Sequence, residues 1–174
     1  NNYYLFVGRL VPEKGVHVLI KAFIQVNTLR KLVILGADPM VGSPYKKSLL
    51  KLAKENVSFL GAIYGEEYKD ICKACYANMR PSINNAEGIG PVTIEALGFG
   101  NCIIASDVPQ NIEALGEAGI FFPKCDVNSL KKKIKYIEEN YNIVQIYRKK
   151  AIERAKLFSW KEIIDRIENI YQKL

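Results

Sequence analysis

The stretch YYLFVGRLVPEKGVHVLIKAFIQVN, residues 3–27, combines two different periodicities. Its first part, residues 3–8, is a short aromatic and aliphatic run that ends in glycine, which is typical of a buried β-strand. Residues 16–27 instead repeat apolar side chains at the spacing of an amphipathic helix. A strand that is followed closely by a helix is the repeating unit of parallel α/β sheets.

The same alternation continues along the chain. Five further strands are expected at KLVILG (31–36), VSFLG (57–61), ANMRPS (77–82), CIIAS (102–106) and GIFF (119–122). Helices are expected at 43–55, 66–76, 91–98 and 110–115 and then, without further strands, at 128–140, 142–157 and 160–173. The run at 77–82 departs most from a strand pattern, since Asn78 and Arg80 are polar and Pro81 has no N–H to donate. The sequence predicts an α/β fold with a parallel six-stranded sheet, helices on both faces and appended C-terminal helices.

The length and composition indicate one domain. A chain of 174 residues with 49% hydrophobic residues can bury one full core and is too short for two large domains. We expect a single domain over residues 1–174, with a helical segment at about 128–174. No apolar run reaches the roughly 20 residues that span a bilayer. Because a predicted strand begins almost at once after Asn1, we expect a segment of a longer protein.

The positive charge is concentrated toward the C-terminus. The net charge is +7, and residues 124–174 hold 13 Lys and Arg against 7 Asp and Glu. Basic runs such as 131–133 and 148–150 can attract an anionic membrane surface or a nucleic acid. Their alternation with apolar positions at helical spacing favours a solvated helix face. We expect no nucleic-acid partner and only weak peripheral contact with anionic lipid at the inner face of the membrane.

Four cysteines, Cys72, Cys75, Cys102 and Cys125, are too few for a disulfide scaffold of this length and favour a reduced, cytoplasmic setting. The CKAC motif at 72–75 has the spacing of a zinc or redox site, yet it lies in a predicted helix. A zinc site would need Cys102 and Cys125 to converge on it, because the sole histidine, His17, is distant in sequence. Buried structural thiols are the favoured interpretation.

Two cations follow the first strand, in GRLVPEKG (8–15). Arg9 and Lys14 lie on one short connection, where a planar guanidinium and a compact ammonium suit a phosphate or diphosphate. In parallel sheets, ligands bind beyond the carboxyl ends of the strands, at the point where the strand order reverses. The structural alternative is that Glu13 and Lys14 are exposed side chains on a loop before a helix and bind no ligand.

A second loop, in NNAEGIGPVTIEAL (84–97), places glycines before a helix start. Gly88 and Gly90 leave the backbone bare, so that a ligand can approach closely, and Pro91 suits the first helical position. Amides at a helix N-terminus bind anions. The signal is weak by itself, because the third glycine of the dinucleotide fingerprint is absent. The structural alternative is a tight βα turn.

Two carboxylates flank these glycines. Glu95, about one turn into the helix, would repel a phosphate but can accept hydrogen bonds from a ribose diol. Glu87 can bind hydroxyl groups of whatever is attached to the far phosphate. The pattern therefore fits a nucleoside diphosphate that carries a polyhydroxylated group. Alternatively, Glu95 only complements the helix dipole.

The loop after residues 57–61 carries a weaker signal. Ala62 and Ile63 follow the strand directly, where their backbone groups can meet the edge of a base. An ordinary strand-to-helix connection is the simpler interpretation.

Taken in order, these segments resemble the C-terminal, donor-binding domain of retaining glycosyltransferases of family 4 (group 1), which have the GT-B fold of two Rossmann-like domains. FVGRLVPEKGVHVLIKAF is similar to the opening motif of that domain, and PSINNAEGIGPVTIEALGFGNCIIASDVPQNIEAL resembles its Glu-x7-Glu block. AGIFFPKCDVNSLKKKI and FSWKEIIDRIENIYQKL are similar to its closing elements. The resemblance implies that this chain is a Rossmann-like half of a GT-B fold and that the N-terminal acceptor domain is absent from it.

The resemblance also implies roles for the matching residues. It puts Arg9 and Lys14 on the donor diphosphate, Glu87 on the sugar and Glu95 on the ribose, with Arg9, Lys14 and Glu87 as the catalytic residues. It puts Ile63 beside the base, and along the sugar and phosphates the backbone of Gly88, Ile89, Gly90, Pro91, Val92 and Thr93. It implies transfer of a hexose from a UDP-, GDP- or ADP-linked donor to an acceptor hydroxyl, with retention and without a required metal or cofactor. The acceptor, a glycan, lipid or small molecule, would bind mainly to the missing domain.

Several features depart from the family pattern. Pro91 removes one backbone donor, GNC replaces Gly-Lys-Pro, and GADP replaces a Gly-x-Gly turn. His17 does not match the histidine that such enzymes place near the reacting sugar, so the isolated chain is expected to be inactive. Two alternatives stay open: a stand-alone nucleotide or sugar-phosphate binding module, and a nucleotide-sugar epimerase of the same fold.

Overall fold

A single parallel sheet of six strands organises the molecule, in a computed structural model that describes residues 2–85 and 88–172. The strands are β1 (Tyr3–Val7), β2 (Lys31–Leu35), β3 (Val57–Gly61), β4 (Ala77–Arg80), β5 (Ile103–Ser106) and β6 (Gly119–Phe122). Their order across the sheet is β3-β2-β1-β4-β5-β6. The predicted α/β class and the six predicted strands are confirmed. Three of the strands are one residue shorter than expected, and the run at 77–82 ends two residues early, at residue 80.

The helices follow the predicted order. They are α1 (Val16–Phe23), α2 (Pro44–Leu52), α3 (Gly65–Ala74), α4 (Pro91–Gly98), α5 (Pro109–Leu115), α6 (Val127–Glu139), α7 (Tyr141–Ala155) and α8 (Trp160–Tyr171). Short 3₁₀ turns occur at η1 (Pro12–Lys14), η2 (Gly116–Ala118) and η3 (Lys156–Phe158). The largest difference is in α1, which ends at Phe23 where the periodicity predicts residue 27.

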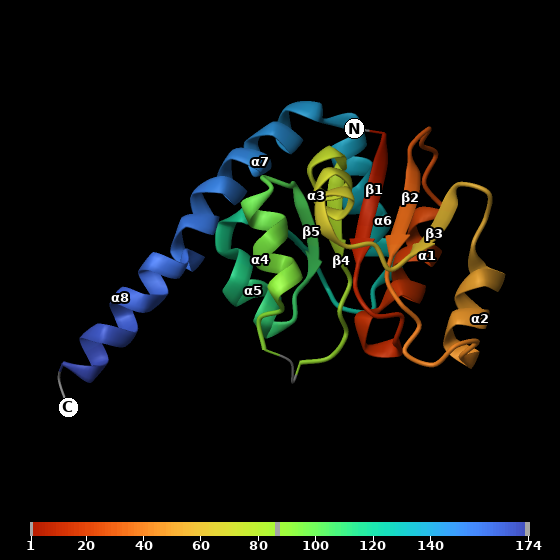
Figure 1. The fold of residues 1–174 in the computed structure, drawn as a ribbon. Coiled ribbons are helices and arrows are strands. Elements are labelled where there is room, and N and C mark those ends of the chain that lie inside the picture. Colours follow the sequence, from red (N-terminus) through yellow and green to blue (C-terminus); the bar gives the residue numbers. More distant parts are fainter. Residues whose placement is uncertain (1, 86–87, 173–174) are drawn as a thin grey trace.

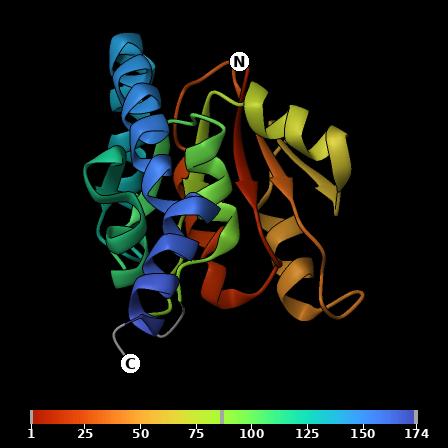
Figure 2. The ribbon, with the colours of Figure 1, turned by 60° about the vertical axis from the view of Figure 1, so that its left-hand side comes forward.

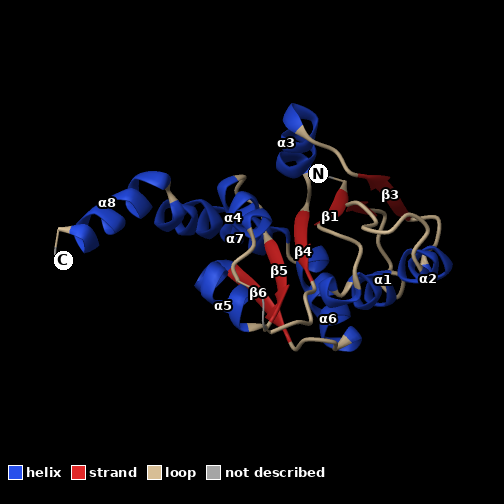
Figure 3. Ribbon diagram, turned by 60° about the horizontal axis from the view of Figure 1, so that its bottom comes forward, coloured by secondary structure: helices blue, strands red, loops and turns tan. Residues whose placement is uncertain are grey.

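Helices cover both faces of the sheet. Helices α1 and α6 pack together on one face, and α3 and α4 lie on the other (Figure 3). Because successive strand residues point to opposite faces, β1 contributes to both layers. Tyr4 and Phe6 join the core on the α1 and α6 side, whereas Leu5 packs with Cys72 of α3.

Strand β4 accommodates its two polar residues in the buried interior. Asn78 Nδ2 donates a hydrogen bond to Asn101 Oδ1 at 3.3 Å, and Arg80 Nη1 donates to the Val7 carbonyl oxygen at 2.7 Å. Pro81 comes directly after the strand, so its missing N–H costs no hydrogen bond of the ladder. The features that make residues 77–82 look unlike a strand are thus compatible with a central position in the sheet.

Helix α6, the first of the basic C-terminal helices, turns its apolar residues toward the core. Leu130, Ile134 and Ile137 of α6 are fully buried, while Lys132 and Lys135 are exposed. This arrangement supports the solvated helix face that the sequence favours. Within the described residues, no helix has both the length and the apolar character that crossing a membrane would require.

Helix α8 continues the line of α7 beyond the sheet (Figures 1 and 2). Ile164, Ile167 and Ile170 are exposed and recur every three residues, so they form a stripe along the helix. An apolar stripe at helical spacing is typical of a helix that packs against other protein.

The cysteines divide into buried and exposed thiols. Cys72, Cys75 and Cys102 are buried and Cys125 is exposed, and all four are free. The described part of the chain contains no group of three His, Cys, Asp or Glu side chains placed to hold a metal ion. Burial raises the pKa of both Cys75 and Cys102 to about 12. The buried cysteines therefore occupy the structural role that the sequence favours.

We expect one thiol per chain to react rapidly with Ellman's reagent at pH 8 in the native protein, and four after denaturation. The reacting thiol is Cys125, because the buried thiols are shielded and stay protonated. The Cys125→Ser variant should lose the rapid reaction entirely. Rapid reaction of a second thiol in the folded wild-type protein would contradict this assignment.

Candidate functional site

The sheet has its switch point between β1 and β4. These strands are neighbours, but the chain leaves β1 toward β2 and leaves β4 toward β5. The loops that follow them therefore diverge and open a crevice at the carboxyl ends of the strands. Two loops begin there, residues 8–15 after β1 and residues 81–90 after β4, and they contain the glycines that the sequence selects.

Backbone contacts hold the two loops together. The Ile83 N–H donates a hydrogen bond to the Glu13 carbonyl oxygen at 2.8 Å. Gly15 has φ +67°, and a Cβ added there would lie 1.9 Å from the Pro81 carbonyl oxygen. Only glycine fits this position without displacing the backbone. The approach fixes the short turn that carries Lys14 against the loop after β4.

A cavity of about 360 Å³ lies between these loops, and we call it the polar cavity because Arg9, Lys14 and Arg80 line it. Its described walls come from the end of β1 and its loop (Phe6, Val7, Gly8, Arg9, Lys14), from Arg80 and Ser82, from the start of α4 (Gly88, Gly90, Pro91, Val92, Thr93) and from Gln110 and Asn111. Arg9 is exposed, Lys14 is half-buried and Arg80 is buried. The described residues of this wall include three cations and no carboxylate, so the cavity favours an anion.

The start of α4 offers bare backbone to this cavity. A Cβ added at Gly88 or Gly90 would meet nothing within 4 Å, so space for a ligand is open on that side. Pro91 has no N–H, and the Thr93 N–H is bonded to the Gly90 carbonyl oxygen at 3.0 Å. The helix start therefore has fewer free amides than the sequence pattern predicts, because the first turn is tightened by that bond.

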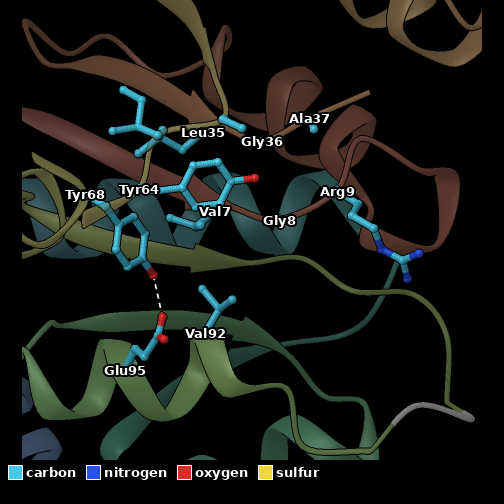
Figure 4. Close-up of a pocket in the computed structure, with 12 residues that line it drawn as sticks. Val7, Gly8, Arg9, Leu35, Gly36, Ala37, Tyr64, Tyr68, Val92 and Glu95 are labelled. Carbon is cyan, nitrogen blue, oxygen red and sulfur yellow. Dashed lines mark hydrogen bonds between the residues drawn. The ribbon is translucent and has the colours of Figure 1, made fainter. Parts of the chain in front are cut away.

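A second, more apolar cavity of about 310 Å³ adjoins the first. Both are lined by Val7, Gly8, Arg9 and Val92; Leu35, Gly36, Ala37, Ala62, Ile63, Tyr64, Tyr68 and Glu95 complete the second. Figure 4 shows Tyr68 and Glu95 toward one end of this cavity and Arg9 toward the other. The two cavities together form an elongated site that is apolar at one end and cationic at the other.

Glu95 is the one carboxylate among the described residues of the apolar cavity. The Tyr68 hydroxyl donates a hydrogen bond to Glu95 Oε2 at 2.5 Å (Figure 4). Burial raises the pKa of Tyr68, and the bond to Glu95 raises it further. Glu95 lies beyond the first turn of α4, which contains no acidic residue. A helix-dipole role accordingly fits this carboxylate poorly, because the dipole acts within the first turn.

The structure gathers most of the residues selected from the sequence. Arg9 and Val92 border both cavities; Lys14, Gly88, Gly90, Pro91 and Thr93 line the polar one, and Ile63 and Glu95 the apolar one. Ile89 instead packs against the cluster that contains Ala96 and Leu97. Glu87 lies outside the described residues.

Several residues of the cavity wall were not recognised in the sequence. Tyr68, Arg80, Gln110 and Asn111 are the clearest examples. Gln110 Nε2 donates to the Asn84 carbonyl oxygen at 2.6 Å, while its buried Oε1 has no partner among the described residues. For Gln110 and Asn111 a signal was available, because they are polar residues in the first turn of a helix that follows a strand.

Known proteins are similar to this chain in sequence. A family model for glycosyl transferases group 1 matches residues 1–158. An uncharacterized glycosyltransferase of Methanocaldococcus jannaschii is 30% identical, over 99% of this chain and 48% of its own length. The O-antigen chain mannosyltransferase RfbU of Salmonella typhimurium is 30% identical, over 79% of this chain and 39% of its own length.

The fold also matches solved structures. Anabaena Alr3699/HepE, solved in complex with UDP, aligns with a TM-score of 0.92 and 22% identity, over 100% of this chain and 49% of that one. The chain thus spans about half the length of the relatives that it matches.

Proposed function

Because this chain belongs to the glycosyl transferases group 1 family and has the fold of one half of a GT-B glycosyltransferase, we propose that its adjoining cavities bind a nucleotide-sugar donor. The observation that carries the proposal is the join between an apolar cavity with one described carboxylate and a polar cavity with three cations. A nucleoside diphosphate has the matching arrangement, with an apolar base and a ribose diol at one end and two phosphates at the other.

We assign the nucleoside to the apolar cavity. The base lies beside Ile63, and Glu95 accepts hydrogen bonds from the ribose hydroxyls. Tyr68 supports this role, because its hydroxyl occupies one oxygen of Glu95 and holds the carboxylate in place. The other carboxylate oxygen is then left to the ribose.

The diphosphate and sugar belong to the polar cavity. Arg9 and Lys14 bind the diphosphate, and the bare backbone of Gly88 and Gly90 lies along the sugar and phosphates. Glu87 binds hydroxyls of the sugar. We propose this for Glu87 from its place in the sequence, directly before Gly88, where the described wall of the cavity resumes.

The chemistry follows from these charges. Transfer of the sugar leaves a nucleoside diphosphate with one additional negative charge, and cations that are already in position stabilise that charge in the transition state. Arg9 and Lys14 supply this stabilisation without a metal ion. We propose that the hexose moves with retention of its anomeric configuration, with the departing phosphate assisting the acceptor hydroxyl on the same face of the sugar.

The comparisons support a chemical class of donor, a nucleoside diphosphate sugar, and do not select its base. Alr3699/HepE of Anabaena was solved with UDP, and RfbU of Salmonella is named as a mannosyltransferase. Both observations support a nucleoside diphosphate linked to a hexose. UDP, GDP and ADP are the nucleotides to compare, because the cavity presents mainly backbone and apolar groups to a base.

The acceptor belongs to the remainder of a longer protein in this proposal. The chain spans 48% of its relative from Methanocaldococcus jannaschii, so room for a second domain exists in proteins of this kind. We propose that this domain binds a glycan, lipid or small-molecule acceptor and covers the exposed stripe of Ile164, Ile167 and Ile170 on α8. The chain described here is then the donor-binding half and is inactive alone.

We expect the chain to bind one of UDP, GDP and ADP weakly, and to bind it equally well with and without a chelator. The reason is that the cations of the cavity wall, rather than a metal ion, compensate the phosphates. Isothermal titration calorimetry with the three nucleotides, each with and without EDTA, measures both properties. The corresponding monophosphate is the control and should bind more weakly, because it meets fewer of the cations. Absence of heat with all three diphosphates, or loss of binding with EDTA, would refute the proposal.

A further inference from the structure

Arg80 is a buried cation at the switch point. It is the last residue of β4, the strand next to β1, and it is only 8% exposed. Its Nη1 donates a hydrogen bond to the carbonyl oxygen of Val7, the last residue of β1, at 2.7 Å. The guanidinium therefore lies between the ends of the two strands whose loops enclose the polar cavity.

The remaining nitrogens of Arg80 are not used within the described protein. Nε and Nη2 are inaccessible and have no hydrogen-bond partner in residues 2–85 and 88–172. No carboxylate in that part of the chain forms an ion pair with Arg80. Buried guanidinium nitrogens that have no hydrogen-bond partner are unfavourable, and a ligand group that accepts from Nε and Nη2 would relieve this cost.

The charge of Arg80 persists at neutral pH. Burial lowers the pKa of its guanidinium to about 10, while Tyr68 and Glu95 act in the opposite direction. The group therefore remains protonated under ordinary conditions and offers only donors. An anionic oxygen is the natural partner for such a group.

We propose that the guanidinium of Arg80 shifts toward the polar cavity when the donor binds, and that it then donates to an oxygen of the diphosphate as a third cation beside Arg9 and Lys14. The inference rests on the proposed function and adds a residue to its binding site. Arg80 lines the same cavity as those two cations, together with the glycines at the start of α4. The described wall contains no carboxylate that would compete for it.

Arg80 differs from the other two cations in how it is held. Arg9 is exposed, so its long side chain must be ordered when the ligand binds. Arg80 is already held by Val7 and lies in a poorly solvated environment, where an ionic hydrogen bond is stronger than at the surface. Its contribution to diphosphate affinity should therefore be at least comparable with theirs.

The Arg80→Met variant tests this role. It keeps an apolar side chain of similar length but removes the charge and the donors. We expect the affinity for the nucleoside diphosphate that binds the wild-type chain to fall by about tenfold or more, as expected for a lost charged hydrogen bond. The affinity for the corresponding nucleoside, followed by NMR titration, should stay unchanged. The midpoint of thermal unfolding should stay level or rise, because the variant removes a buried charge that has two nitrogens without partners in the described chain.

Arg148 provides a matched control. Its Nη2 donates to the carbonyl oxygens of Cys75, at 2.5 Å, and Tyr76, at 3.2 Å, and its buried Nε has no described partner. These contacts precede β4, at the end of the strand opposite to Arg80. Arg148→Met should lower the midpoint of thermal unfolding and leave the diphosphate affinity unchanged.

The outcomes separate this inference from the proposed function. If the wild-type chain binds none of the three diphosphates, the proposed function fails. If it binds one of them and folded Arg80→Met binds it equally well, or loses affinity for diphosphate and nucleoside by the same factor, the role of Arg80 is overturned. If Arg80→Met does not fold, Arg80→Lys decides. A single ammonium cannot hold Val7 and a phosphate as a guanidinium does, so unchanged diphosphate affinity in Arg80→Lys would overturn the inference.

Discussion

The Gly15→Ala variant is expected to lose about 3 kcal/mol or more of the free energy of unfolding. Two costs combine in this change. Alanine must adopt the left-handed backbone conformation at φ +67°, and its Cβ would lie 1.9 Å from the Pro81 carbonyl oxygen. Since that oxygen belongs to the backbone, the loops after β1 and β4 must separate. Chemical denaturation followed by circular dichroism measures the loss.

Gly42→Ala is the matched control for Gly15→Ala. Gly42 has φ +75°, but a Cβ added there would meet only Lys47 Cε, at an ordinary 3.9 Å. This variant keeps the backbone strain and lacks the clash, so it should lose only about 1 kcal/mol. A similar loss in both variants would mean that the contact with Pro81 is not what makes glycine necessary. Where Gly15→Ala still folds, its diphosphate affinity should fall as well, because Lys14 moves with the loop.

Replacing Glu95 by alanine is expected to weaken nucleoside diphosphate binding by about 1 to 3 kcal/mol, the range for a lost charged hydrogen bond. The effect comes from the ribose, which loses an acceptor. Tyr68→Phe is the control, because it removes only the hydroxyl that supports Glu95, and it should have a smaller effect. Calorimetry with the diphosphate that binds the wild-type chain measures both. If Glu95 only complemented the dipole of α4, its loss would lower stability slightly and leave affinity unchanged.

Replacing Glu87 by alanine should affect turnover and not nucleoside diphosphate affinity, in contrast to the replacement of Glu95. Nucleoside diphosphate affinity should stay nearly unchanged, because that ligand carries no sugar for Glu87 to bind. Turnover of the full-length protein should fall by about a hundredfold or more, since a contact that orients the sugar and stabilises its developing positive charge acts mainly in the transition state. Equal behaviour of Glu87→Ala and Glu95→Ala toward the diphosphate, with both variants folded, would refute this division of roles.

The sequence by itself determined the order of the elements. Strands and helices are indicated by patterns of residues that are close together in the sequence. Examples are the apolar run at 31–36 and the helical repeat at 128–140. The same reasoning selected Arg9, Lys14 and the Gly88 to Glu95 segment, because ligands in parallel sheets bind where strands end. Arg9, Lys14 and most of this segment do line the two cavities, whereas Ile89 and Ile94 pack against a neighbouring hydrophobic cluster. Glu87, the other carboxylate selected, lies outside the described residues.

Only the tertiary structure decided which segments meet. Periodicity carries no information about strand order, so the sequence could not place β1 beside β4 or join the loops at Gly15 and Pro81. For the same reason Tyr68 was missed, since its hydrogen bond to Glu95 links α3 to α4 across the intervening strand β4. The polar side chain of Arg80 is unusual for a buried strand, so the sequence pattern spoke against a strand at 77–82. Its place in the centre of the sheet became clear only when Val7 supplied a partner from the neighbouring strand, because burial and hydrogen bonding at that position depend on residues distant in sequence.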